Sequence, residues 1–526
     1  MTKGFSSMSR SLTRRTTAVA ALSGAMVLAP LGVAMADSAP QSGTGPSTKT
    51  APYVLPVAKD VSITSLLTVG DAPDGYPMVG IPDGLGAFGR GEGPFTIFMN
   101  HELQPPAGAV RAHGQVGAFV SKWTIDPKSG AVSGGSDLIT SVNYWNYPAK
   151  TYGSAPVAPA GAAAGHTAAF SRFCSGALTE PGQLLNRKSG KGYDGQIYMA
   201  NEESGDEGRV FGVTTDGVAW QLPALGLFSW ENTLVAPTRG DATVVLGNED
   251  ANPGQLRVYV GTKGSSGSAV EKAGLTNGTS FVIDDTNPAV TNDAQYRAAY
   301  GKGADVPVVL NAINTTVNGK AQNAEALGKG ISLNRIEDGS FDPKNPNDYY
   351  FLTTEGGNTA PVTPGVSRDG GGLWLLRFSD VNQPSLGATL TLLLDGSEAP
   401  FLSKPDNMTI DREGNIVIQE DPGDNAHVAR IVAYRIEDGA LATLAQFDPA
   451  QFTPGAPGFI TQDEESSGII EISKLADQGS TFLFDAQVHK KLADPALVEM
   501  GQLLTLTVAS WGDVYDQSSS EEHDNH

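Results

Sequence analysis

The stretch "GNIVIQEDPG", residues 414–423, reads as a short apolar strand that runs directly into two carboxylates. Short runs rich in Val, Ile, Tyr and Phe, bounded by turn residues, are typical of β-strands. The same pattern occurs five more times, in "PFTIFMNHEL" (94–103), "GQIYMANEES" (195–204), "ATVVLGNEDA" (242–251), "DYYFLTTEGG" (348–357) and "STFLFDAQVH" (480–489). Each of these six predicted strands carries an acidic residue at its C-terminal end.

Weaker predicted strands lie between these six. They are "AFVSKWTID" (118–126), "GRVFGVTTDG" (208–217), "QLRVYVGTK" (255–263), "GLWLLRFSD" (372–380) and "RIVAYRIEDG" (430–439). The recurring order of strand, acidic turn, loop and second strand is typical of the blades of a β-propeller. We therefore predict an all-β propeller with loop insertions at 143–193 and 264–330, the second containing a short helix near 292–300. A pair of β-sandwiches would not explain why acids recur at one strand end.

Composition and charge agree with this prediction. The 63 glycines and 33 prolines, with little helical periodicity, favour many short strands joined by turns. The net charge of −22 is spread along the chain and excludes a nucleic-acid partner, because phosphate backbones are bound by Lys and Arg. The acidic surface is explained equally well by solubility and by calcium binding.

The N-terminus has the features of an export signal. Arg14 and Arg15 precede an apolar run over 18–33, and the small residues "AMA" (34–36) suit cleavage before Asp37. The sequence "LTRRTTAV" indicates twin-arginine export, which carries folded proteins; the general route is the alternative, because threonines follow the arginine pair.

These features define the expected organisation of the chain. Residues 1–36 are a signal peptide, 37–50 a disordered linker, 51–516 one propeller domain and 517–526 a disordered acidic tail. No other long apolar segment exists, so we expect no membrane contact after signal cleavage. The expected product is a monomer that is secreted or lies in the periplasmic or cell-wall space.

Acids at equivalent strand ends are expected to converge in a propeller. The innermost strand of each blade runs along the central channel, and crowded carboxylates there need cations. Many hard oxygen ligands suit Ca²⁺. For any single segment a polar turn is explanation enough, but the six together favour a metal site. The candidate ligands at the strand ends are Glu102, Glu202, Glu203, Glu249, Asp250, Glu420 and Asp421.

Three other segments add candidates. In "SLNRIEDGSFDP" (332–343), Arg335 and Glu337 are two residues apart and face the same side of a strand, so the carboxylate can bind metal while the guanidinium binds an anion. Glu231 follows an aromatic pair in "GLFSWENTLV", and Asp406 lies at a tight turn in "KPDNMTID". Taken singly, each is equally compatible with a surface ion pair or a turn.

Cys174 is the only cysteine, so the chain has no intrachain disulfide. On composition alone it is either a small buried apolar residue or a metal ligand. No nucleotide-binding glycine loop, nucleophile elbow or HExxH motif occurs in the sequence.

Nine short motifs follow one another in the order found in the PhoX-type alkaline phosphatases, and the chain resembles that family over residues 90–490. They are "NHE" (100–102), "FCSGALTEPG" (173–182), "NEES" (201–204), "FSWEN" (228–232), "GNEDA" (247–251), "NRIEDG" (334–339), "TEGGN" (354–358), "PDNMTID" (405–411) and "QEDPG" (419–423). The resemblance implies a six-bladed propeller, exported by the twin-arginine route, that hydrolyses phosphate monoesters with iron and calcium in its central channel.

The resemblance also implies residue roles. Cys174 would give a thiolate to iron, although Ala177 and Leu178 interrupt the family's usual spacing there. Arg335 would contact phosphate and Glu337 would bind iron, as in the family's Arg-Pro-Glu motif. The expected cofactors are Fe³⁺ and Ca²⁺, and the expected partner is a small phosphate ester.

Two alternatives remain open. One is a non-catalytic secreted propeller that uses calcium for rigidity, and the other is a different calcium propeller hydrolase, similar to a phytase or a lactonase. Neither alternative requires a thiolate from Cys174.

Overall fold

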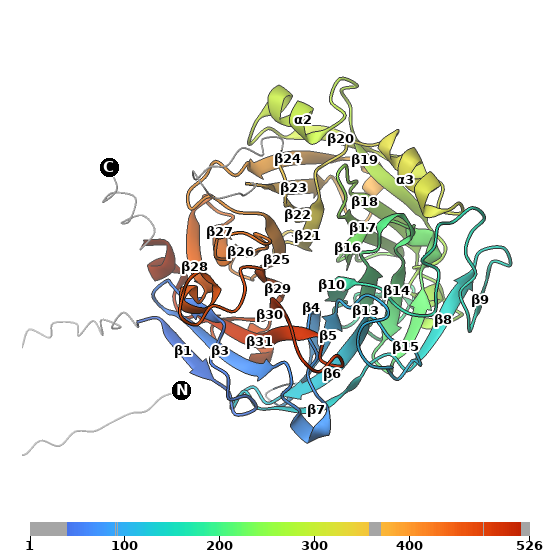
Figure 1. Ribbon diagram of the computed structural model, residues 1–526. Coiled ribbons are helices and arrows are strands. Elements are labelled where there is room, and N and C mark those ends of the chain that lie inside the picture. Colours follow the sequence, from blue (N-terminus) through green and yellow to red (C-terminus); the bar gives the residue numbers. More distant parts are fainter. Residues whose placement is uncertain (1–38, 90, 92, 357–369, 477, 517–526) are drawn as a thin grey trace, which may run out of the picture. The chain divides into compact units, whose positions relative to one another are not determined.

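Figure 1 shows the computed structural model of the protein, which describes residues 39–89, 91, 93–356, 370–476 and 478–516. The predicted signal peptide (1–36) and acidic tail (517–526) lie outside the described residues. The chain from Ser38 onward forms one compact unit, and its described part consists mainly of β-strands. The all-β prediction is confirmed.

The strands form five large sheets and one small one. The first holds β4 (Pro82–Phe88), β5 (Phe95–His101), β6 (Phe119–Ile125) and β7 (Val132–Asp137). The second holds β10 (Phe173–Leu178), β13 (Ile197–Glu202), β14 (Val210–Thr214), β15 (Val218–Gln221), β8 (Ser141–Asn146) and β9 (Thr151–Gly153). The third, of nine strands, holds β16 (Trp230–Val235), β17 (Ala242–Glu249), β18 (Arg257–Thr262), β19 (Thr279–Asp285), β20 (Val306–Ile313), β24 (Ala388–Leu394), β23 (Gly372–Phe378), β22 (Asp348–Thr353) and β21 (Ile336–Phe341).

Two further large sheets bring the two ends of the described chain together. The fourth holds β25 (Pro405–Ile410), β26 (Asn415–Glu420), β27 (Arg430–Arg435), β28 (Leu441–Phe447) and β2 (Val54–Pro56). The fifth holds β29 (Glu464–Glu471), β30 (Ser480–Lys491), β31 (Glu499–Val508), β3 (Val61–Thr68) and β1 (Gln41–Thr44). The small sheet pairs β11 (Leu185–Asn186) with β12 (Lys191–Gly192). Strands from the beginning of the described chain, β1 to β3, thus form the outer edges of sheets whose other strands come from its end.

Six strands surround the centre of this unit. β4, β10, β16, β21, β25 and β29 each contact the next in that order, and β29 contacts β4, so the series closes (Figure 1). The nine-stranded sheet supplies two of them, β16 at one edge and β21 at the other. Apolar cores fill the spaces between neighbouring sheets, as where Met199 and Val210 pack with Trp230 and Val245.

The six acid-ending strands are not innermost, contrary to the sequence prediction. They are β5, β13, β17, β22, β26 and β30, and each lies second from the centre. A second strand is covered on both faces: β22 packs against the other part of its own sheet on one face and against the fourth sheet on the other, and all positions of β22 and β26 are buried. The inner strands are more polar and so gave a weaker strand signal.

Two other predictions need correction. Residues 41–44, expected to be disordered, form β1, an edge strand that pairs with β3 and tolerates polar side chains because it is exposed. The insertions at 143–193 and 264–330 are not only loops: the first contains the inner strand β10, and the second contains β19 and β20.

Helices are few and short. The predicted helix near 292–300 is confirmed as α2 (Asp293–Tyr300), where the Asn292 side chain accepts a hydrogen bond from the Gln295 amide as an N-cap. The others are α1 (Ala269–Lys272), α3 (Gly319–Leu327), α4 (Pro449–Phe452) and α5 (Ser473–Ala476). Among the described residues, no helix is long and apolar enough to span a membrane.

Candidate metal centre

The second residue of every inner strand carries a potential metal ligand. We call these six the ring residues: Asp83, Cys174, Glu231, Glu337, Asp406 and Glu465. The first four are buried, and Asp406 and Glu465 are half-buried. Because the six inner strands form a closed series, one position on each strand brings these side chains around one centre.

A β-bulge follows the first residue of five of the six inner strands. In β10, for example, Phe173 pairs with Glu202 and Gly176 pairs with Ala200, so that Cys174 and Ser175 together stand opposite Asn201. Equivalent register shifts occur in β4, β16, β21 and β25, whereas in β29 the shift comes later, between Ser467 and Ile470. A bulge bends the strand and redirects the side chain of the extra residue. Here the redirected side chains are the ring residues.

Amide side chains fix the bulges to the neighbouring sheets. Asn100 Nδ2 donates to Cys174 O at 2.6 Å, and Asn201 Nδ2 donates to Glu231 O at 2.8 Å. Asn248 Nδ2 donates to Glu337 O, and Gln419 Nε2 donates to Ser467 O at 3.3 Å. Each amide stands on a second strand and bonds to the next inner strand in the series; Asn248 does so across the nine-stranded sheet, and the other three reach a neighbouring sheet. The backbone carrying these ring residues is therefore also held by a strand to which it is not paired.

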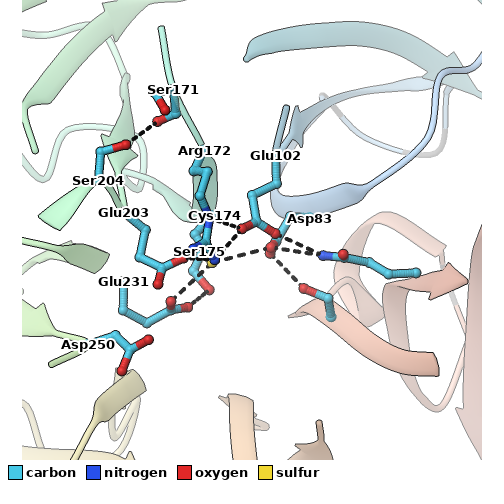
Figure 2. Close-up of polar contacts among 12 residues, drawn as sticks. Asp83, Glu102, Ser171, Arg172, Cys174, Ser175, Glu203, Ser204, Glu231 and Asp250 are labelled. Atoms are coloured by element: carbon cyan, nitrogen blue, oxygen red, sulfur yellow. Dashed lines mark hydrogen bonds and ion pairs between the residues drawn. The ribbon is translucent and has the colours of Figure 1, made fainter. Parts of the chain in front are cut away.

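Three groups of ligand atoms lie close enough to bind metal ions. Within each group the nearest N, O or S donors are all within 4.8 Å of one another. The groups are Asp83–Glu102–Cys174, Cys174–Glu203–Glu231 and Glu231–Glu337–Asp406. Cys174 and Glu231 each belong to two groups, so the three groups are continuous. Figure 2 shows Cys174 between Asp83 and Glu102 on one side and Glu203 and Glu231 on the other.

Burial and mutual repulsion hold protons on these groups in the absence of cations. Burial, with the nearby Glu102 and Glu231 carboxylates, raises the pKa of Asp83 well above its usual range. Burial raises the pKa of Glu231 to about 7, and burial with the surrounding carboxylates raises the pKa of the Cys174 thiol. Such a cluster gains stability from any cation that replaces the protons.

Polar side chains one or two positions after the ring residues connect the inner strands. Ser175 Oγ donates to Glu231 Oε1 at 2.7 Å and accepts from Asn407 Nδ2 at 2.8 Å. Asn407 Oδ1 in turn accepts from Ser467 Oγ, which also bonds Asp83 Oδ1 at 2.6 Å. These bonds join β10, β16, β25, β29 and β4, and they hold the ligand carboxylates in place.

The paired acids at the strand ends divide into two sets. Glu202, Glu249 and Glu420 turn away from the centre and pair with the buried Arg209 and Arg257 and the half-buried Arg430, at N–O distances of 2.6, 3.1 and 2.6 Å. Burial alone would raise the pKa of Glu420, but Arg430 and His427 outweigh it and lower the pKa to about 2. The structure does not bring these three predicted ligands into the cluster.

The acids that lie one residue beyond the strand ends belong to the centre. Glu102, Glu203 and Asp250 lie one residue beyond a strand end, and Figure 2 shows all three around Cys174 and Glu231. Asp421 interacts with Glu465 and Asp406. Successive side chains of a strand point to opposite faces, so one acid of each pair binds an arginine and the other faces the centre.

Two arginine side chains are bound by these acids. Arg335 is bidentate to Asp250, with Nε–Oδ1 at 2.8 Å and Nη2–Oδ2 at 2.9 Å, and its Nη2 lies 3.3 Å from Glu337 Oε1. Arg172 Nε donates to Glu102 Oε1 at 2.7 Å and its Nη2 pairs with Glu203. Arg335 therefore lies where the sequence predicted, next to Glu337.

Sequence reasoning missed Asp83, Glu465 and Arg172. Asp83 was detectable, because "PDGL" (82–85) repeats the pattern of "PDNM" (405–408) that gave Asp406. Glu465 begins the serine-rich "ESSG", which reads as a turn, and Arg172 lies within 143–193, which the sequence predicts to be a loop insertion. The place of Glu465 in the ring, and of Arg172 beside it, became apparent only from strand pairing.

The donor set fits the expected metals. The carboxylate oxygens of Glu231, Glu337 and Asp406 are the hard ligands that Ca²⁺ prefers, and the thiol of Cys174 beside them suits a transition metal such as iron. Glu337 Oε1 is buried and accepts no hydrogen bond from the described residues; its one charged neighbour there is Arg335 Nη2 at 3.3 Å, which leaves the oxygen able to bind a cation.

The sequence profile of the alkaline phosphatase PhoX family matches residues 191–471, more than half of the chain. No curated protein matches the sequence. Among solved structures, the chain is similar to Pseudomonas fluorescens PhoX in complex with vanadate, a transition-state analogue, with a TM-score of 0.61 and 13% identity over 90% of this chain and 98% of that one. A luciferin-regenerating enzyme gives a TM-score of only 0.30 at 10% identity, over 82% of this chain and 92% of that one. At these identities the structural likeness concerns the fold.

Proposed function

The chain belongs to the alkaline phosphatase PhoX family, and from this premise we propose that it hydrolyses phosphate monoesters at an iron and calcium centre. One observation carries the proposal: three connected groups of carboxylate and thiol donors lie beside an arginine that is oriented for anion binding. A calcium scaffold without activity needs neither Cys174 nor Arg335 at such a place.

We propose that the fold around this centre is a six-bladed propeller. The closed series of six inner strands, each beginning a run of antiparallel strands, supports six blades. The nine-stranded sheet then holds two blades joined through β20 and β24. The pairing of β3 with β31 joins the first and last parts of the described chain and would close the ring.

The metal ligands would be drawn from the ring residues and their neighbours. Cys174 would bind iron, with oxygens from Asp83, Glu102 or Glu203 completing its ligand set, while Glu231, Glu337 and Asp406 would bind calcium. This assigns Glu337 to calcium, whereas the resemblance implied iron, because Glu337 groups with Glu231 and Asp406 and not with Cys174. When bound, the cations would act as Lewis acids that stabilise the negative charge on the phosphate oxygens.

Arg335 would orient the phosphate. Its Nε and Nη2 are occupied by Asp250, while its Nη1 has no hydrogen-bond partner among the described residues and can donate to a phosphate oxygen. Asp250 is a positioning residue in this scheme, since it fixes the plane of the guanidinium. Burial would raise the pKa of Asp250, but Arg335 outweighs it and the carboxylate stays charged.

The test is elemental analysis and p-nitrophenyl phosphate turnover on protein purified from its native host. We expect iron together with calcium, and turnover that is lost with the metals. Calcium alone and no turnover would contradict the phosphatase and favour the calcium scaffold; calcium alone with another hydrolase activity would favour a phytase- or lactonase-like enzyme.

We also propose export by the twin-arginine route, on the strength of Arg14 and Arg15. Replacing both by lysine should leave the folded precursor inside the cell. An exported double variant, detected by cell fractionation, would point to the general route.

A further inference from the structure

We propose that Arg172 is a second phosphate-positioning residue, which binds the same phosphate group as Arg335. This inference rests on the proposed phosphatase function. Arg172 and Arg335 would place two guanidinium groups around one phosphate, an arrangement suited to the two negative charges of a monoester.

The two arginines occupy equivalent places, each immediately before a different inner strand. Arg172 lies two residues before the ring residue Cys174, and Arg335 lies two residues before the ring residue Glu337. Both have left-handed backbone, with φ of 46° and 54°, which is uncommon for a residue other than glycine. The same backbone turn therefore directs both side chains at the start of their strands.

Each guanidinium is held by a carboxylate that follows the second strand next to the preceding inner strand in the series. Arg172 donates from Nε to Glu102 Oε1 at 2.7 Å, as Arg335 donates from Nε to Asp250 Oδ1 at 2.8 Å. Glu102 and Asp250 are themselves equivalent, because each immediately follows the last residue of a second strand, β5 or β17. The two sites are thus copies of one arrangement, related by the repeat of the fold.

A series of acids links the two arginines. Arg172 Nη2 pairs with Glu203, the Glu203 and Asp250 carboxylates interact electrostatically, and Asp250 holds Arg335. The donor group Cys174–Glu203–Glu231 includes both Glu203, which pairs with Arg172, and the ring residue Cys174, two positions after Arg172. Both arginines therefore belong to one connected cluster.

Arg172 retains a free donor within the candidate centre, unlike the neighbouring Arg209. Its Nη1 has no hydrogen-bond partner among the described residues, and its side chain is 36% exposed, against 29% for Arg335. Arg209 is the contrast: it is fully buried, and Nε, Nη1 and Nη2 all donate to protein oxygens. Arg172 is therefore oriented like Arg335, and like Arg335 it keeps one nitrogen available to donate a hydrogen bond to a ligand.

Lys404 occupies the same place before Asp406, with a φ of 46°. The second strand of the preceding unit ends at Thr353 and continues with Thr354, so no carboxylate stands where Glu102 and Asp250 stand. Lys404 has the charge without the orienting partner, and we restrict the proposal to Arg172.

The experiment compares the parent with Arg172→Lys, Arg335→Lys and the double variant. Lysine keeps the charge but loses the planar, multiple-donor group. We expect each single variant to lower kcat/KM on p-nitrophenyl phosphate by about tenfold or more and to raise the inhibition constant of inorganic phosphate, with iron and calcium content retained. Because both side chains would bind one phosphate, the double variant should lose less than the product of the two single losses.

Arg377→Lys is the matched control. Arg377 is bidentate to Asp348 at 2.7 Å through both Nε and Nη2, on β22 and β23 and outside the candidate centre. We expect its kinetics to equal those of the parent.

Arg172→Lys with parental kcat/KM and phosphate inhibition would overturn the proposal. So would metal loss in Arg172→Lys that accounts for its kinetic defect, because Arg172 would then only hold Glu102 and Glu203. If the parent itself hydrolyses no phosphate monoester, the proposed function fails. In that case direct titration of parent and Arg172→Lys with inorganic phosphate decides the inference, and equal affinities reject it.

Discussion

Replacing Cys174 by serine changes one donor atom in two of the three ligand groups. The Cys174 sulfur lies 3.0 Å from Glu231 Oε2 and 3.4 Å from Asp83 Oδ2. A hydroxyl is a hard, poorly deprotonated ligand, so we expect Cys174→Ser to lose iron and at least about 100-fold of the activity. Circular dichroism should still report a β protein. An active variant that keeps its iron would make Cys174 an ordinary buried residue.

At the same scale, the sequence predicted the kinds of residue in the centre better than their individual identities. Glu231, Glu337, Asp406 and Cys174 were each singled out, and all four stand on the ring. Between neighbours such as Glu202 and Glu203 no choice was possible. The choice depends on which acid meets a buried arginine on the next strand, here Arg209, and that pairing is a property of the folded sheet.

At the scale of elements, the bulged inner strands depend on amides of their neighbours. Asn201 is fully buried, and its Nδ2 donates to Ser175 O, Trp230 O and Glu231 O, on the two inner strands β10 and β16. Removing the amide takes a donor away from these carbonyls in a buried place, and Ser175 O keeps the longer bond from Asn100 Nδ2 at 3.4 Å. Such a loss costs about 1–3 kcal/mol.

We therefore expect Asn201→Ala to lower the free energy of unfolding by about that amount, with an unchanged denaturant m-value. Urea unfolding followed by tryptophan fluorescence measures both quantities. The exposed Asn314, replaced by alanine, should change stability by no more than about 0.5 kcal/mol. Equal effects of the two substitutions would show that the Asn201 amide does not stabilise the bulges.

The position of whole strands was the part of the fold that the sequence predicted least well. Acid-ending strands such as β26 stood out because both of their faces are buried, and this apolar signal led to the wrong assignment as innermost. The true inner strand β29, "EESSGIIE" (464–471), combines acids, serines and glycine, because one end of it forms the polar centre. Polar residues that serve a site weaken the pattern on which strand prediction depends.

At the scale of the whole molecule, the chain carries a net charge of −22 and gathers many of its acids at one centre. Removing metal therefore leaves uncompensated charge in a buried place. Chelator should lower the melting temperature of the protein and abolish turnover.

The size of that effect should depend on pH, with a direction that follows from the raised pKa values. Burial raises the pKa of Glu231 from its ordinary 4.5 to about 7, so the metal-free folded state binds more protons than the unfolded state between these pH values. Stability of the metal-free protein then falls as pH rises through this window, since protonation of Glu231 favours the folded state. Glu337 and Asp406, whose pKa values are also raised by burial first and then by neighbouring acids, act in the same direction.

Bound cations replace those protons, so the metal-loaded protein should not share the decline. We expect the difference in melting temperature between loaded and chelated protein to widen from pH 4.5 to pH 7. Calorimetry of both forms at several pH values measures this difference. In the Glu231→Gln variant residue 231 cannot titrate, so the melting temperature of the chelated form should depend less steeply on pH. A difference that stays constant or shrinks over this range would mean that the buried acids are charged without metal, and the centre would then need another source of compensation, such as Arg172 and Arg335.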